Sequence, residues 1–231
     1  SAGLSITSQI SISLTDNFGE LNIPPVDTYP AQVRSDIKKY MNGLGEGLSI
    51  QKLFVSKFGK AGKNNYFYLT SGILEDMFNG FGGEFLHHDF TKRVSYGFEL
   101  FRVKKRDYKF GFGMQDYMKT TGHINLYKPL TNGLVMKLSW GQYLAGDEGG
   151  TLRVWKRFRN GAEMGAHVSF TDVSFEEFGE GSFDKGIFFK FPVNLFGQGS
   201  IQSFNWKPLT KDPASKLYKP HDLYSEIIRY H

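Results

Sequence analysis

The densest group of acidic side chains in the chain lies between residues 172 and 184. Its second half carries four carboxylates, Glu176, Glu177, Glu180 and Asp184, interleaved with glycine and phenylalanine. A glycosidase needs two carboxylates at a defined separation, and a calcium loop needs oxygen ligands at regular positions. The glycines make the loop flexible, so the sequence does not fix the separation between two carboxylates. The phenylalanines interrupt the regular series of oxygen ligands that a calcium loop needs. Three roles remain for this segment: an inward-folded loop paired with cations, a polymer-contacting loop, or a catalytic pair.

Basic side chains gather shortly before this segment, at Arg153, Lys156, Arg157 and Arg159. Arg153 and Arg157 share one face of a predicted strand, because successive side chains on a strand alternate between its two faces. Arginines inside a barrel can line a path for anions or sugars, or pair with carboxylates across the interior. The candidate lumen or polysaccharide-contacting residues are therefore Arg153, Arg157, Glu176, Glu177, Glu180 and Asp184.

The sequence lacks the motifs that usually indicate a nucleophile, a metal site or a phosphate-binding loop. The chain contains no cysteine, which excludes a thiolate nucleophile and a thiolate metal site. Its histidines lack a second ligand at metal-binding spacing, since His87 and His88 point to opposite faces of a strand. We find no phosphate loop, serine nucleophile elbow or zinc-protease motif. We expect no catalytic residue, no metal and no cofactor.

The elements that position these residues are predicted strands. In the first, Leu4, Ile6 and Ile10 share one face while Ser5 and Thr7 share the other, a pattern typical of a two-faced sheet. Similar alternation, or a run rich in strand-forming residues, recurs along the chain. The twelve predicted strands cover residues 4–14, 49–58, 66–73, 81–90, 94–103, 119–127, 134–144, 151–158, 164–171, 185–193, 200–206 and 223–230.

Connections between the strands are mostly short. Asn132-Gly133 and Asn160-Gly161 are dipeptides that favour two-residue hairpin turns. Residues 16–48 form one long connection, since prolines lie in its first half, and residues 31–44 within it predict a short helix. The basic run 102–109 predicts a solvated turn or a contact with lipid headgroups. We expect a single domain over residues 1–231.

Periodicity alone does not tell which face meets which solvent. Aromatic residues make up 16% of the chain, and large rings often occupy the apolar face. Six rings near strand ends are typical of an interfacial girdle: Tyr66, Tyr127, Trp140, Tyr143, Trp206 and Tyr230. The mean hydropathy of −0.36 is compatible with a polar lumen, and twelve strands enclose more space than side chains readily fill. The pattern favours an all-β fold: an antiparallel up-and-down transmembrane β-barrel of about twelve strands, with one short helix in a long connection.

Several segments resemble the YjbH/GfcD family of outer-membrane exopolysaccharide and capsule proteins of Gram-negative bacteria. They are Val33-Arg34-Ser35-Asp36-Ile37, the stretch from Leu74 to Glu84, Tyr143-Leu144-Ala145-Gly146-Asp147, the stretch from Thr171 to Gly186, and Trp206-Lys207-Pro208-Leu209-Thr210-Lys211-Asp212. Family members are longer than this chain, so the resemblance implies that it corresponds to their C-terminal barrel region.

The resemblance also implies a location and a pathway. It places the barrel in the bacterial outer membrane, in contact with outer-membrane lipid and an anionic or neutral polysaccharide. The implied protein partners are periplasmic proteins of the same export system and a polysaccharide export channel, with no nucleic acid. The net charge of +5 and pI near 9.2 do not choose among anionic partners.

Three functions follow from these expectations. The first is an outer-membrane barrel that serves secretion or assembly of an extracellular polysaccharide. The second is a non-conducting barrel that scaffolds an export complex. The third is an enzyme that modifies polysaccharide, which would need a working carboxylate pair in the acidic segment. We favour the first.

Overall fold

The computed structural model describes residues 3–15, 17, 20, 33–92, 94–174, 183–193, 202–206 and 215–229. Within these residues, eleven strands form one antiparallel sheet in the order of the sequence. They are β1 (Leu4–Ile12), β2 (Leu48–Lys60), β3 (Asn65–Ile73), β4 (Phe78–His88), β5 (Ser95–Arg106), β6 (Met114–Pro129), β7 (Leu134–Gln142), β8 (Glu148–Arg157), β9 (Glu163–Thr171), β10 (Asp184–Val193) and β11 (Gln202–Trp206). The helical elements are α1 (Ile37–Gly45), η2 (Thr131–Gly133) and α3 (Leu223–Arg229).

Both Asn-Gly dipeptides lie in turns as predicted, but the connections span residues 130–133 and 158–162 and are longer than two-residue hairpin turns. Asn132 and Gly133 have φ of 60° and 73° in the β6–β7 connection. In the β8–β9 connection only Gly161 has a positive φ, and Asn160 instead accepts a hydrogen bond from the Ala162 amide through its side-chain oxygen. Both dipeptides therefore reverse the chain, by different local means.

One predicted strand was wrong. Residues 223–230 were expected to be the twelfth strand, but residues 223–229 form helix α3. Leu223, Tyr224, Ile227 and Ile228 repeat with a helical spacing, which places them on one face of a helix. Asp222 accepts a hydrogen bond from the Ser225 amide (2.9 Å), as a residue at a helix N-terminus does. The described sheet therefore has eleven strands.

The outer face of the sheet carries many apolar residues, and the inner face combines polar residues with a cluster of buried rings and aliphatic side chains. On β6, Ile124 is 70% exposed, whereas its neighbours His123 and Asn125 are buried. On β7, Trp140 is 67% exposed and Ser139 is buried. The same alternation covers much of the sheet and reverses the usual arrangement of a soluble protein, in which the buried face is apolar.

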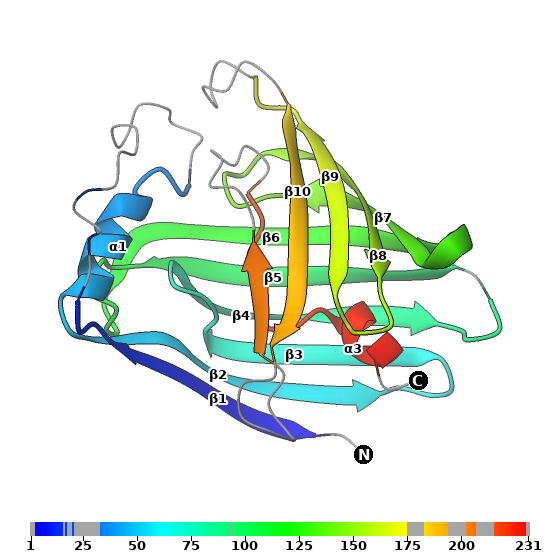
Figure 1. Ribbon diagram of the computed structural model, residues 1–231, viewed down its shortest axis with the longest axis horizontal. Helices are drawn as coiled ribbons and strands as arrows, with labels where there is room; N and C mark the ends of the chain where they lie inside the picture. Colours follow the sequence, from blue (N-terminus) through cyan, green and yellow to red (C-terminus); the bar gives the residue numbers. More distant parts are fainter. Residues whose placement is uncertain are drawn as a thin grey trace.

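Strong twisting wraps the sheet around its polar face. In Figure 1, β1–β6 run across the view, while β8, β9 and β10 stand upright in front of them. Among the described residues, β1 pairs only with β2 and β11 pairs only with β10, so the sheet as described is open. No helix within the described ranges has the length and apolarity needed to cross a membrane.

The predicted aromatic girdle is largely wrong. Tyr66, Tyr127 and Tyr143 are buried rather than at an outer rim, because they lie on inward-facing positions. Trp140 alone of the described members is exposed. The Trp206 side chain and Tyr230 lie outside the described residues.

One end of the curled sheet is covered by α1, which lies beside the ends of β1 and β2 and the turn after β5 (Figure 1). The expectation of a solvated turn over residues 102–109 is partly wrong: residues 102–106 belong to β5, where Lys105 and Arg106 are buried, whereas Arg102 and Lys109 are exposed. Lys105 is buried and pairs with Asp36 at 2.8 Å. Arg106 is fully buried, and its guanidinium donates to the carbonyls of Ile50 (2.8 Å) and Gly111 (3.1 Å). These bonds join the end of β5 to β2 and to the next turn.

Replacing Arg106 by Met should lower the free energy of unfolding by about 3 kcal/mol, because several buried carbonyl groups lose their donor. Urea unfolding of the purified protein in detergent measures the loss. Arg102→Met is the matched control, since Arg102 is exposed on the same strand and should change stability by less than about 0.5 kcal/mol. Equal midpoints for the two variants would contradict the structural role of Arg106.

Candidate functional site

The C-terminal segment, residues 215–229, lies on the concave side of the sheet. Leu217, Leu223 and Tyr224 are buried there. Tyr224 stacks on Tyr127 of β6 with ring centroids 4.2 Å apart. Arg34, which precedes α1, donates to the Ser215 hydroxyl and to the Lys216 carbonyl, both at 3.0 Å. The segment is therefore fixed to both the sheet and the end cap.

Lys219 is the main electrostatic contact between this segment and the sheet. Its ammonium lies 2.9 Å from Glu84 of β4 and also pairs with Glu99 of β5. Burial disfavours the charged amine, but these two carboxylates outweigh that effect and raise the pKa of Lys219. Asp222 lies 3.9 Å from both Lys219 and Lys137. Burial opposes its charge, yet the two lysines hold its pKa at about 2.

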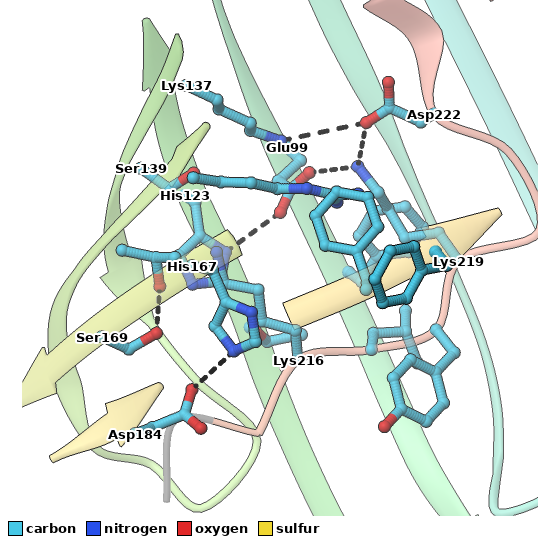
Figure 2. Close-up of a pocket in the computed structure, with 18 residues that line it drawn as sticks. Glu99, His123, Lys137, Ser139, His167, Ser169, Asp184, Lys216, Lys219 and Asp222 are labelled. Atoms are coloured by element: carbon cyan, nitrogen blue, oxygen red, sulfur yellow. Dashed lines mark hydrogen bonds and ion pairs between the residues drawn. The ribbon is translucent and has the colours of Figure 1, made fainter. Parts of the chain in front are cut away.

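A cavity of about 320 Å³ lies between this segment and strands β5–β10. Figure 2 shows labelled side chains from the sheet and from the segment converging on it. The lining combines charged groups, the hydroxyl-bearing residues Thr121, Ser139, Thr151 and Ser169, and apolar side chains. Its volume lies at the lower end of the range of small-molecule sites, about 300–1,000 Å³.

Two cations of the lining have no carboxylate partner among the described residues. Arg153 lies with its guanidinium 3.9 Å from the centroid of the Phe188 ring. The Lys216 ammonium lies 5.4 Å from the centroid of the Tyr143 ring. Neither forms an ion pair within the part of the chain that the structure describes. Burial, followed by the positive charge of Lys137, lowers the pKa of Lys216 to about 7.

Register places further positive or titratable groups next to Arg153. Lys137 of β7 and His167 of β9 are its direct cross-strand neighbours. His167 is 3.2 Å from Asp184 at the start of β10, and its ring lies where a side chain at Gly186 would clash at 2.6 Å. Like charges directly opposite on neighbouring strands are destabilising. The row therefore sets two cations, Lys137 and Arg153, side by side on the cavity wall, with Asp222 3.9 Å from Lys137.

His123 connects this row to the ion pairs of Lys219. Its Nδ1 atom lies 3.0 Å from Glu99, and its ring packs edge-on against Tyr143. Its Nε2 atom is buried and has no hydrogen-bond partner among the described residues. Within the described ranges, no group of three or more acidic, histidine or cysteine side chains is arranged to hold a metal ion.

The structure brings together part of the predicted site. Arg153 and Asp184 both line the cavity. Arg157 is on the same inner face but forms an ion pair with Glu163 of β9, at 2.5 Å, which is the pairing role considered for it. Glu176, Glu177 and Glu180 lie outside the described residues.

Sequence reasoning missed most of the charged lining. Glu99, His123 and Lys137 sit at alternating inward positions of predicted strands, so the alternation carried a signal for them. Lys216, Lys219 and Asp222 come from a segment that crosses the interior, for which local sequence gave no signal.

Comparison with known proteins shows which family model and which curated protein the chain matches. A sequence model of the family described as "YjbH: Exopolysaccharide biosynthesis protein YbjH" matches residues 1–229. The chain is 34% identical over 228 residues to an Escherichia coli (strain K12) protein named "Uncharacterized lipoprotein YjbH". That match covers 94% of this chain and 32% of the relative, so the chain spans about a third of the relative's length. No solved structure matches it.

Lys219→Met should loosen the C-terminal segment, because Glu84 and Glu99 would keep buried charges without their shared partner. Breaking such a pair costs about 3–5 kcal/mol. Limited digestion with chymotrypsin measures the change as faster cleavage after residues 217, 218 and 224.

Lys216→Met is the matched control, since Lys216 lies in the same segment and has no ion pair among the described residues. Adding Glu84→Gln to Lys219→Met should slow the cleavage again, because one uncompensated charge is removed. Equal cleavage of both single variants would show that the ion pairs do not hold the segment.

Proposed function

The chain belongs to the YjbH family of exopolysaccharide biosynthesis proteins, and from this premise we propose that it forms an outer-membrane β-barrel that serves secretion or assembly of an extracellular polysaccharide. In this proposal the curled sheet closes, its apolar outer face meets lipid, and its polar inner face lines the lumen.

The single observation that carries the proposal is the reversed polarity of the sheet. Ile124, Phe98 and Trp140 are at least half exposed on the outer face. In water such a surface promotes association, because contiguous exposed apolar patches are rare on soluble monomers. In a bilayer the same surface is compatible with the hydrocarbon core, and strands cross a bilayer only as a closed barrel without free edges. Polar inward residues then face the lumen, as in outer-membrane barrels.

The pathway rests on the family. The matching family is described by its role in exopolysaccharide biosynthesis, and the Escherichia coli relative is named a lipoprotein. A lipoprotein is attached to a membrane, which agrees with a membrane location for this chain. Periplasmic proteins of the same system and a polysaccharide export channel are its proposed partners, and the proposed role involves no catalysis by this chain.

A second candidate function is a non-conducting barrel that scaffolds an export complex. The contacts of the C-terminal segment favour it, because Lys219, Leu223 and Tyr224 occupy the interior through which a polymer would pass. The two candidates share the membrane location and differ in whether the lumen opens.

Two adjacent residues of β8 test the orientation of the sheet. Leu152 faces outward and Arg153 lines the cavity, and the chain has no native cysteine to interfere. A fluorophore attached at Leu152→Cys should be strongly quenched by nitroxide-labelled lipid in reconstituted bilayers, because it lies in the acyl chains.

The same fluorophore at Arg153→Cys is the matched control and should be quenched several-fold less, since it lies inside. Ile124→Cys provides a second outer site on a different strand. Equal quenching at Leu152→Cys and Arg153→Cys would contradict the proposed orientation.

Polymer export is tested in cells that lack the native gene and are complemented with the chain in its natural full-length context. Extracellular polysaccharide should fall without the protein and return with it; an unchanged amount would overturn the pathway. In planar bilayers, the scaffold predicts a silent native protein, whereas an export path predicts conductance that rises in Lys219→Met. Silence of the native protein supports the scaffold, and conductance that rises in Lys219→Met supports the export path, because Lys219→Met should release the segment that occupies the interior.

A further inference from the structure

The cavity beside the C-terminal segment has the composition of a ligand site rather than of an interior packing defect. A packing defect is lined by apolar groups and stays dry. This cavity combines apolar walls with hydroxyl groups and with charged side chains of both signs. Its cations are Arg153, Lys137, Lys216 and Lys219, and its carboxylates are Glu99, Asp184 and Asp222. The Arg153 side chain is exposed to solvent and Lys216 is half-buried, so both cations are accessible to a ligand that enters the cavity.

Two cations of the described lining have no ion pair. Lys219 pairs with Glu84 and Glu99, and Asp222 lies 3.9 Å from Lys137. Arg153 and Lys216 have no such match, and Lys137 lies directly across the β7–β8 ladder from Arg153. A small anion near these two side chains would compensate both and reduce the repulsion along the row.

The rest of the lining is suited to a sugar ring. The Thr151 hydroxyl bonds both the Tyr143 hydroxyl (2.7 Å) and the Ser169 hydroxyl (2.8 Å), and Ser169 keeps a lone pair that can accept from a ligand hydroxyl. Phe188 and Leu217 supply apolar surface against which the C–H groups of a sugar can pack. Mostly apolar walls with a few placed polar groups are typical of small-molecule sites.

We propose that this cavity binds a saccharide unit that carries an anionic substituent, with Arg153 and Lys216 holding the anion. The inference rests on the proposed function for the source of the saccharide, a charged unit of the polymer or its terminus. Carboxylate and phosphate substituents share the required chemistry, and the experiment below separates them.

Isothermal titration of the purified full chain in neutral detergent tests the site with glucuronate, glucose 6-phosphate, glucose and inorganic phosphate. Glucuronate or glucose 6-phosphate should bind at least about tenfold more tightly than glucose, because a charge-assisted hydrogen bond contributes about that factor. The tighter of the two anionic sugars identifies the substituent. Inorganic phosphate binding as tightly as either sugar would overturn the saccharide assignment.

Arg153→Gln and Lys216→Gln should each weaken the tighter anionic sugar at least about tenfold. Lys63→Gln is the matched control, because it removes one positive charge from an exposed turn between β2 and β3. Lys216→Arg keeps the charge and should retain binding, which separates loss of the site from loss of folding. Unchanged affinity in both cavity variants, or no binding by the native protein, would overturn the proposal.

The pH dependence gives an independent readout. Lys216 faces Lys137, Glu99, Arg153 and its own neighbour Lys219, and burial with these charges brings its pKa to about 7. A bound anion favours the protonated amine, so affinity should fall as the pH rises from 6 to 9. Lys216→Arg should lose much less affinity between pH 7 and 9, because its guanidinium stays charged. The same decline in that variant would exclude Lys216 as the cause.

Failure of this inference is distinguishable from failure of the proposed function. Lipid quenching at Leu152→Cys reports the membrane orientation and does not depend on ligand. A protein that shows the expected quenching but binds no anionic sugar would overturn the cavity assignment alone.

Discussion

Charge compensation inside a polar, curled sheet is the constraint on which the rest of the structure depends. Glu84 and Glu99 point to the interior from neighbouring strands, and each would be costly there without a counter-charge. Lys219 supplies that charge from the far end of the chain. The ion pairs therefore do more than stabilise two strands: they fix where the C-terminal segment crosses the interior.

The position of that segment divides the interior into two chemically different parts. On the side of β4 and β5, lysine and carboxylates are matched. Toward β7 and β8, Lys137 and Arg153 stand side by side and Lys216 faces them, with less negative charge nearby. The cavity lies on this second side. The proposed scaffold and the proposed binding site are compatible, because the same segment both crosses the interior of the curled sheet and supplies one wall of the cavity.

The outer face follows from the same alternation that makes the inner face polar. Ile124 is exposed because His123 and Asn125 are inside, and no change of strand register could bury all three. The proposed barrel would give such a sheet an apolar medium outside and a polar one inside. The family of the chain indicates a role in exopolysaccharide biosynthesis, and the lining of the cavity is the basis for the proposed ligand.

Alternation and strand-forming composition predicted the eleven described strands and put Arg153 and Arg157 on one face, and the Asn-Gly dipeptides predicted two turns, because all of these depend on neighbouring residues. Tertiary structure alone decided the rest. The apolar face of the helix at residues 223–229 packs inside the sheet, Arg106 binds carbonyls from two other segments, and Lys219 pairs with carboxylates more than a hundred positions away. Local patterns specify which face a side chain takes, whereas a charge network across the interior depends on how distant segments meet.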